Sequence, residues 1–139
     1  MTVPDSHRLI HIAAALLVRD DGMTLVVRKR GTTAFMQPGG KLEPGEAPEV
    51  ALRRELCEEL RFAQPPAADP AYLGRFTAPA ANELDALVVA EVYVLHVRGN
   101  VAPQAEIEEL RWIDPAAPGD IRLAVLTRDE ILPAWLRRT

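Results

Sequence analysis

The sequence predicts a single domain of mixed α/β or α+β class, built on a mixed β-sheet. The 139 residues, 48% of them hydrophobic and 26% charged, suit one globular domain with one sizeable core. Short apolar stretches separated by turn signals predict several strands, some of them in hairpins. Helical stretches are interspersed among these strands, which is typical of a mixed sheet covered by helices. We therefore expect one domain over residues 1–139.

The N-terminal part of the chain begins with a hairpin signal. Residues 9–18 are apolar and β-compatible, 20–22 read Asp-Asp-Gly, and 25–27 resume the strand pattern. Two further turns are expected, a tight one at 37–40 and another at 44–45, because both contain Pro-Gly.

A helix is expected next, over residues 48–60. Proline is tolerated in the first helical turn, so Pro48 is compatible with this start, whereas Ala47 is a poor N-cap. An apolar stripe along the helix would hold it on a sheet; it consists of Leu52, Leu56 and Leu60.

The rest of the chain alternates strands and loops and ends in a helix. Strands are expected at 71–77, 87–97 and 108–113. Loops are expected at 64–70 and 78–85, and a turn at 99–100. The final helix is expected over 127–136, with Pro133 leaving its end open.

Charge and composition exclude several classes of function. A net charge of −4 argues against general nucleic-acid binding, since phosphate backbones attract basic surfaces. There is no run of about 18 apolar residues, so no membrane-spanning helix is expected. Cys57 is the single cysteine, which excludes an internal disulfide and favours the reducing cytoplasm.

Three carboxylates share one face of the expected helix. At about 100° per residue, Glu55, Glu58 and Glu59 fall within an arc of roughly 100°. Like charges three or four residues apart destabilise a helix by about 0.2–0.5 kcal/mol per pair. These glutamates also lie toward the negative end of the helix dipole. A hard divalent cation such as Mg²⁺ would compensate both effects. The alternative is an ordinary solvated helix rich in Glu and Arg, since both are good helix formers.

The spacing of these residues resembles the Nudix box. Gly40 is followed after five residues by Glu46, and after seven more by Arg54 and Glu55. An aliphatic residue, one further residue, Glu58 and Glu59 complete the pattern over 40–62. Two positions depart from it: Arg61 stands where the family has glycine, and Phe62 where an aliphatic residue is usual. Arg61 would cost about 1–2 kcal/mol if the left-handed helix end of the family were kept.

The resemblance to Nudix (MutT-like) hydrolases implies an α/β/α sandwich with a central mixed sheet and a loop-helix-loop catalytic box. It also implies hydrolysis of a diphosphate linked to another moiety, often a nucleoside, with Mg²⁺ or Mn²⁺ as cofactor. The metal ligands implied are Gly39, through its carbonyl, and Glu55, Glu58 and Glu59.

Other roles also follow from the resemblance. Arg54 would orient a box glutamate through a charge-assisted hydrogen bond. Glu46 would lie next to the metal ligands without binding the metal itself. The close approach of the backbone at Gly40 belongs to the same site. Lys41 would meet a phosphate, although a solvated turn lysine explains it equally well. Arg28, with Lys29 and Arg30, would face a polyphosphate, although a solvated strand end is the simpler explanation.

The general base stays open at this point, because the residue that serves varies across the family. Glu55 is one candidate, and Glu106, or less favourably Glu109, is the other, reaching in from a late loop.

The substrate also stays open. A nucleoside di- or triphosphate is expected, with ADP-ribose or a nucleotide sugar as the alternative within enzymes. Pro79 does not fall cleanly at the distance found in some ADP-ribose hydrolases. A non-catalytic nucleotide-binding module is the alternative of another class, and an interaction protein using loop 64–70 is a third. Homodimers are common in the family, and no residue decides for or against one here.

Overall fold

The computed structural model describes residues 8–64, 69–80 and 85–138. The elements in chain order are β1 (Arg8–Val18), β2 (Thr24–Lys29), β3 (Gly39–Lys41), α1 (Pro48–Glu59), β4 (Leu60–Phe62), β5 (Ala71–Pro79), β6 (Ala86–His96), β7 (Val101–Pro103), β8 (Ile107–Ile113), the π-helical segment η2 (Leu126–Ile131) and α2 (Leu132–Arg137).

The main sheet is mixed, as expected from the sequence. Its strands follow the order β5-β6-β1-β2-β8, with β3 pairing separately to β1. β1 and β6 run parallel along their whole length, from Arg8 opposite Ala86 to Val18 opposite His96. The other pairs in this sheet are antiparallel, including the predicted hairpin of β1 with β2.

One edge of β1 is shared by two strands, and this arrangement positions the site. The C-terminal end of β1 pairs with β2 at Val18, whereas its middle pairs with β3, where Ala14 lies opposite Gly39. The predicted tight turn at 37–40 is therefore wrong, because Gly39 and Gly40 lie in a strand. Gly39 provides close packing against β1 there rather than a reversal of the chain.

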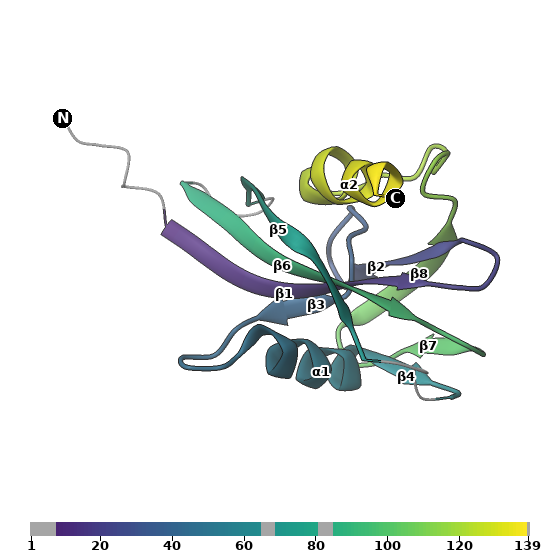
Figure 1. Cartoon of the computed structure of the whole chain (residues 1–139), viewed down its shortest axis with the longest axis horizontal. Coiled ribbons are helices and arrows are strands. Elements are labelled where there is room, and N and C mark those ends of the chain that lie inside the picture. Colours follow the sequence, from purple (N-terminus) through teal and green to yellow (C-terminus); the bar gives the residue numbers. More distant parts are fainter. Residues whose placement is uncertain (1–7, 65–68, 81–84, 139) are drawn as a thin grey trace.

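A helix covers each face of the sheet, which confirms the sandwich (Figure 1). α1 packs on the face formed by Ala13, Ala15, Leu17, Leu25, Val27, Tyr93 and Leu95. η2 and α2 pack on the opposite face, formed by Leu16, Val18, Val26, Ala90 and Val92. Alternate residues of β1 thus belong to different cores, as the two-residue period of a strand requires.

Helix α1 agrees with the prediction to within one residue. It begins at Pro48, and Ala47 makes no side-chain capping bond. The chain leaves the helix in extended conformation at Leu60, with φ −134° and ψ 147°, and enters β4 directly. Arg61 lies in that strand opposite Ala102, so the left-handed helix end and its energetic cost do not arise.

The remaining differences concern short or irregular elements. β4 and β7 form a small antiparallel pair that the sequence analysis did not anticipate. The predicted C-terminal helix is present, but it begins as η2 and becomes α-helical only around Pro133. The expected loop at 78–85 begins later, because β5 runs through Pro79. Residues 65–68 and 81–84, within the two expected loops, lie outside the described part of the chain. No helix in the described part is long and apolar enough to cross a membrane.

Candidate metal centre and active site

The three glutamates of α1 lie on one side of its C-terminal half, with graded exposure. The side chain of Glu58 is 57% exposed, that of Glu55 16% and that of Glu59 only 7%. Leu52 and Leu56 are buried on the neighbouring face, which holds the helix against the sheet. The acidic face of α1, defined as Glu55, Glu58 and Glu59, therefore runs from solvent into the protein.

Glu59 is the buried end of this acidic face. The backbone N–H of Gly39 donates to its Oε1 at 3.1 Å, and the Lys29 ammonium lies 3.9 Å from its Oε2. Burial raises the pKa of Glu59 to about 7, and these two contacts only partly oppose the rise. The nearby charges of Glu55 and Glu106 raise the pKa further. The chain thus holds a carboxylate where its negative charge is only partly compensated.

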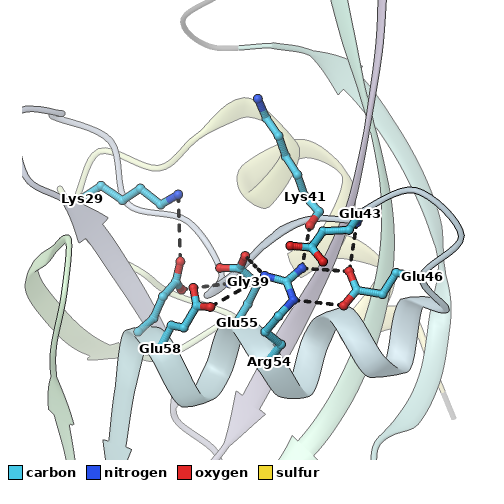
Figure 2. Close-up of polar contacts among 9 residues, drawn as sticks. Lys29, Gly39, Lys41, Glu43, Glu46, Arg54, Glu55 and Glu58 are labelled. Carbon is cyan, nitrogen blue, oxygen red and sulfur yellow. Dashed lines mark hydrogen bonds and ion pairs between the residues drawn. The ribbon is translucent and has the colours of Figure 1, made fainter.

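Arg54 joins the acidic face to the loop before the helix (Figure 2). Its guanidinium donates twice to Glu46, Nε to Oε2 at 3.0 Å and Nη2 to Oε1 at 2.8 Å. Its Nη1 donates to Glu55 Oε2 at 2.9 Å and lies 3.8 Å from Glu58 Oε2, while Nη2 also donates to the carbonyl of Lys41 at 3.1 Å. This pairing lowers the pKa of Glu46 to about 2, so Glu46 is ionised and holds Arg54 in place.

Two glycines make room for this arrangement. A Cβ on Gly40 would collide with the carboxylate of Glu55, and one on Gly39 would collide with the backbone of Ala13 and Ala14. β3 therefore passes between β1 and the acidic face at a distance that side chains would not permit.

Lys41 and Arg28 do not join the acidic face. The Lys41 side chain points away from the carboxylates in Figure 2, and only its carbonyl contacts Arg54. Arg28 donates to Glu108 at 3.2 Å and to Glu109 at 3.1 Å. Any role of these two side chains toward phosphate stays a prediction.

The two late glutamates differ in their surroundings. Arg111 and Arg28 donate to Glu109 and lower its pKa, so this carboxylate is committed to arginines. Glu106 is exposed, and its charge acts on Glu59. Of the two, Glu106 is the one near the acidic face.

The donor set fits a hard divalent cation. It consists of carboxylate oxygens, one of them buried with a raised pKa, beside a strand of glycines whose backbone lies close by. In the described residues, no three acidic, histidine or cysteine side chains are already gathered into a formed metal cluster. The glutamates are instead occupied by Arg54, Lys29 and Gly39.

The profile of the NUDIX domain family matches residues 9–135 of this chain. The chain belongs to the NUDIX family. Among curated proteins, this NUDIX domain is 37% identical over 57 residues to an 8-oxo-dGTP diphosphatase of Haemophilus influenzae, covering 38% of this chain and 42% of that protein. It is 41% identical over 46 residues to a MutT-like protein of Streptomyces ambofaciens, covering 33% of this chain and 30% of that protein. The matches thus span less than half the length of these relatives.

Solved structures show the same fold. The MutT protein of Methanosarcina mazei Go1 superposes with a TM-score of 0.73 at 21% identity, covering 95% of this chain and 98% of that one. A member of the nudix hydrolase family from Chromobacterium violaceum superposes with a TM-score of 0.68 at 30% identity, covering 93% and 77%. The predicted resemblance and fold class are therefore confirmed.

Three residues have positions in the structure that no local signal in the sequence indicates. Nothing local distinguishes Lys29 from its neighbours Arg28 and Arg30 as the partner of Glu59. Gln37 and Thr127 form a buried side-chain hydrogen bond of 2.8 Å across 90 residues of sequence. No local sequence pattern predicts a pair so far apart in the chain.

Proposed function

We propose that this NUDIX domain is a Mg²⁺-dependent pyrophosphohydrolase. It cleaves the diphosphate linkage of a nucleoside di- or triphosphate, or of a nucleoside diphosphate derivative, with water attacking phosphorus. The observation that carries the proposal is the acidic face of α1, whose innermost member, Glu59, is buried with a raised pKa. Such a carboxylate is suited to pairing with a metal cation, because Lys29 and the N–H of Gly39 compensate its charge only in part.

Glu55, Glu58 and Glu59, with the carbonyl of Gly39, would hold the cation; Mn²⁺ would substitute for Mg²⁺. When bound, the ion neutralises phosphate charge and lowers the pKa of a coordinated water. Arg54 keeps the Glu55 carboxylate in one orientation, and its double bond to Glu46 fixes that geometry.

Either Glu55 or Glu106 removes the proton of the attacking water. Glu55 is held by Arg54, whereas Glu106 is exposed and lies near Glu59. Comparing the pH profiles of kcat/KM for Glu55→Gln and Glu106→Gln assigns the role. The variant that lacks the base loses the acidic limb of the profile, where protonation of that carboxylate slows the reaction, and the other variant keeps it.

The 8-oxo-dGTP diphosphatase relative supports a nucleoside triphosphate as substrate. ADP-ribose and nucleotide sugars remain the alternative substrates. The acidic net charge of −4 supports a small-molecule substrate rather than a nucleic acid, and Cys57 as sole cysteine supports a cytoplasmic location. A homodimer is compatible with the family and is tested by light scattering.

A substrate panel tests the proposal. Phosphate release is measured with Mg²⁺ or Mn²⁺ on nucleoside triphosphates, ADP-ribose and nucleotide sugars, with coupled pyrophosphatase and phosphatase. We expect metal-dependent release from at least one substrate, abolished by chelation and strongly reduced in Glu58→Gln. If wild type and Glu58→Gln release phosphate at the same rate from every substrate, the enzyme hypothesis is wrong, and a non-catalytic nucleotide-binding module is the better explanation.

A further inference from the structure

A small cavity lies on the face of the sheet opposite α1. Its volume is about 120 Å³, and it is lined mainly by apolar side chains of β1, β6 and the segment that leads into η2. The wall includes Ile12, Ala14, Met36, Val88, Leu126 and Ile131. Ligand pockets for whole small molecules usually occupy roughly 300–1,000 Å³. This cavity therefore has room for one ring of a ligand rather than for a complete nucleotide.

One polar side chain in the wall of this cavity is incompletely bonded. Gln37 is only 6% exposed, and its Oε1 accepts a hydrogen bond from the hydroxyl of Thr127, which is 1% exposed. The Nε2 of Gln37 is buried and has no hydrogen-bond partner, the one such side-chain atom within 8–64, 69–80 and 85–138. A buried amide left without a partner destabilises a protein by about 1–3 kcal/mol, so its retention calls for an explanation.

The contact with Thr127 occupies one end of the Gln37 amide and leaves the other end free. The Thr127 hydroxyl donates to Oε1, which leaves Nε2 free, and Nε2 can only donate toward a further partner. A ligand group that meets this amide must therefore be a hydrogen-bond acceptor.

The cavity adjoins the acidic face through the backbone. Gln37 precedes Gly39 by two residues, a span of about 7 Å in extended chain. Ala14, in the cavity wall, lies opposite Gly39 in the β1–β3 ladder. The backbone of Gly39 therefore links the two sites, because its N–H donates to Glu59 while its β1 partner Ala14 lines the cavity.

We propose that the cavity receives the ring of the substrate and that Gln37 selects rings bearing an exocyclic carbonyl over rings bearing an amino group. Thr127 is a positioning residue that keeps the amide donating. This assignment rests on the proposed function for the diphosphate, but it concerns binding of the ring alone.

Binding of nucleoside monophosphates in EDTA tests the proposal without hydrolysis. Inosine and adenosine monophosphates form one pair, and uridine and cytidine monophosphates form the other; each pair differs at the edge of the ring, a carbonyl against an amino group. Dissociation constants are measured by calorimetry. We expect the wild type to bind the carbonyl member of at least one pair about tenfold more tightly or better.

Variants separate recognition from folding. Gln37→Glu presents an acceptor in the same shape and is expected to abolish or reverse the preference. Thr127→Val is expected to bring the ratio of the two dissociation constants in a pair to within about threefold of one. Thr24→Val is the matched control, because Thr24 is also fully buried and its hydroxyl makes one hydrogen bond, to Leu17, away from the cavity. The control should lose stability as Thr127→Val does while keeping the wild-type ratio.

Wild-type ratios near one in both pairs, or no saturable binding of any of the four probes, would overturn the assignment. A ratio unchanged in both Gln37→Glu and Thr127→Val would also overturn it. If the protein hydrolyses a substrate with metal but binds both members of each pair equally, the proposed function is supported and the role of Gln37 is refuted. If it binds selectively but hydrolyses no substrate, the role of Gln37 is supported and the proposed function is refuted.

Discussion

Arg54 holds Glu46 through two parallel hydrogen bonds, Nε to Oε2 at 3.0 Å and Nη2 to Oε1 at 2.8 Å. The same guanidinium donates to Glu55 at 2.9 Å, so one side chain ties the loop before α1 to the acidic face. Lysine keeps the charge but cannot make this fork of bonds. The geometry of Glu55 therefore depends on the guanidinium shape and not on charge alone.

Replacing Arg54 by lysine is expected to lower kcat about 10–100-fold, the range found when groups that orient metal ligands are removed. KM should change much less, because the charge near the substrate is kept. Steady-state kinetics with saturating Mg²⁺ measures both. Arg53→Lys is the control, since Arg53 is exposed and pairs with Asp69 away from the site. Equal effects of the two substitutions would contradict the orienting role of Arg54.

Gly40→Ala is expected to impair the site while leaving the fold intact. Gly40 is the one glycine whose φ does not lie in the left-handed region, but a Cβ there would collide with the Glu55 carboxylate. Glu55 must therefore move, and we expect kcat to fall at least about tenfold, with a change of less than about 1 kcal/mol in the free energy of unfolding.

Gly31→Ala is the reciprocal control for Gly40→Ala. Gly31 has φ +85° and open space around its Cα, so alanine there costs stability by about 1–2 kcal/mol without touching the site. Urea denaturation and kinetics on both variants measure the two effects. A Gly40→Ala enzyme with full activity would refute the packing of Glu55 against β3 as a functional contact.

The buried Glu59 makes the metal-free protein less stable as pH rises. Burial raises its pKa from 4.5 to about 7, so the folded state disfavours the charged form. The stability contributed by the uncharged Glu59 is therefore fully present below its pKa of 4.5 in the unfolded chain, and it is lost as pH rises through 7. Relative to Glu59→Gln, the wild type should lose about 2–3 kcal/mol of unfolding free energy between pH 5 and 8 in EDTA.

Glu58→Gln provides the comparison for Glu59→Gln, because Glu58 is on the same helix but more than half exposed. Its unfolding free energy should follow that of the wild type across this pH range. A constant difference between wild type and Glu59→Gln from pH 5 to 8 would show that Glu59 is not desolvated.

Glu91 behaves in the opposite sense and lies outside the acidic face. Burial alone raises its pKa, but hydrogen bonds from Tyr72, His11 and Arg75, of 2.7 to 2.8 Å, lower it to about 2. Its contribution to stability is therefore present above pH 4.5 and lost as pH falls toward 2.

Glu91→Gln is expected to destabilise the protein by about 2 kcal/mol at pH 7, because hydrogen bonds to a charged group are lost. The difference from wild type should shrink toward pH 3. Denaturation at several pH values measures it, with the exposed Glu108→Gln as control. A cost that does not vary with pH would mean that the charge of Glu91 is not what the three donors stabilise.

The acidic face was predictable from the sequence because it depends on local geometry. Carboxylates three and four residues apart necessarily share a helix face, and the adjacent leucines orient that helix on the sheet. The long strands β1 and β6 were predictable for a similar reason, since continuous apolar β-branched runs are typical of buried strands.

The unpredicted features depend on contacts between distant segments. β3, β4 and β7 are three residues long, too short for a periodic pattern. The glycines of β3 are required by packing against β1 and Glu55, a requirement that in sequence resembles a turn signal. The pairing of Gln37 with Thr127 likewise exists only once the C-terminal helix has packed on the sheet.

Binding of Mn²⁺, followed by electron paramagnetic resonance, tests the central claim most directly. The wild type should bind Mn²⁺ saturably at pH 7.5 and should release it to excess Mg²⁺. Glu59→Gln should weaken binding at least about tenfold, whereas Glu49→Gln, on the first turn of the same helix, should match the wild type. Equal Mn²⁺ affinity in all three proteins would contradict the claim that the acidic face of α1 holds the catalytic ion.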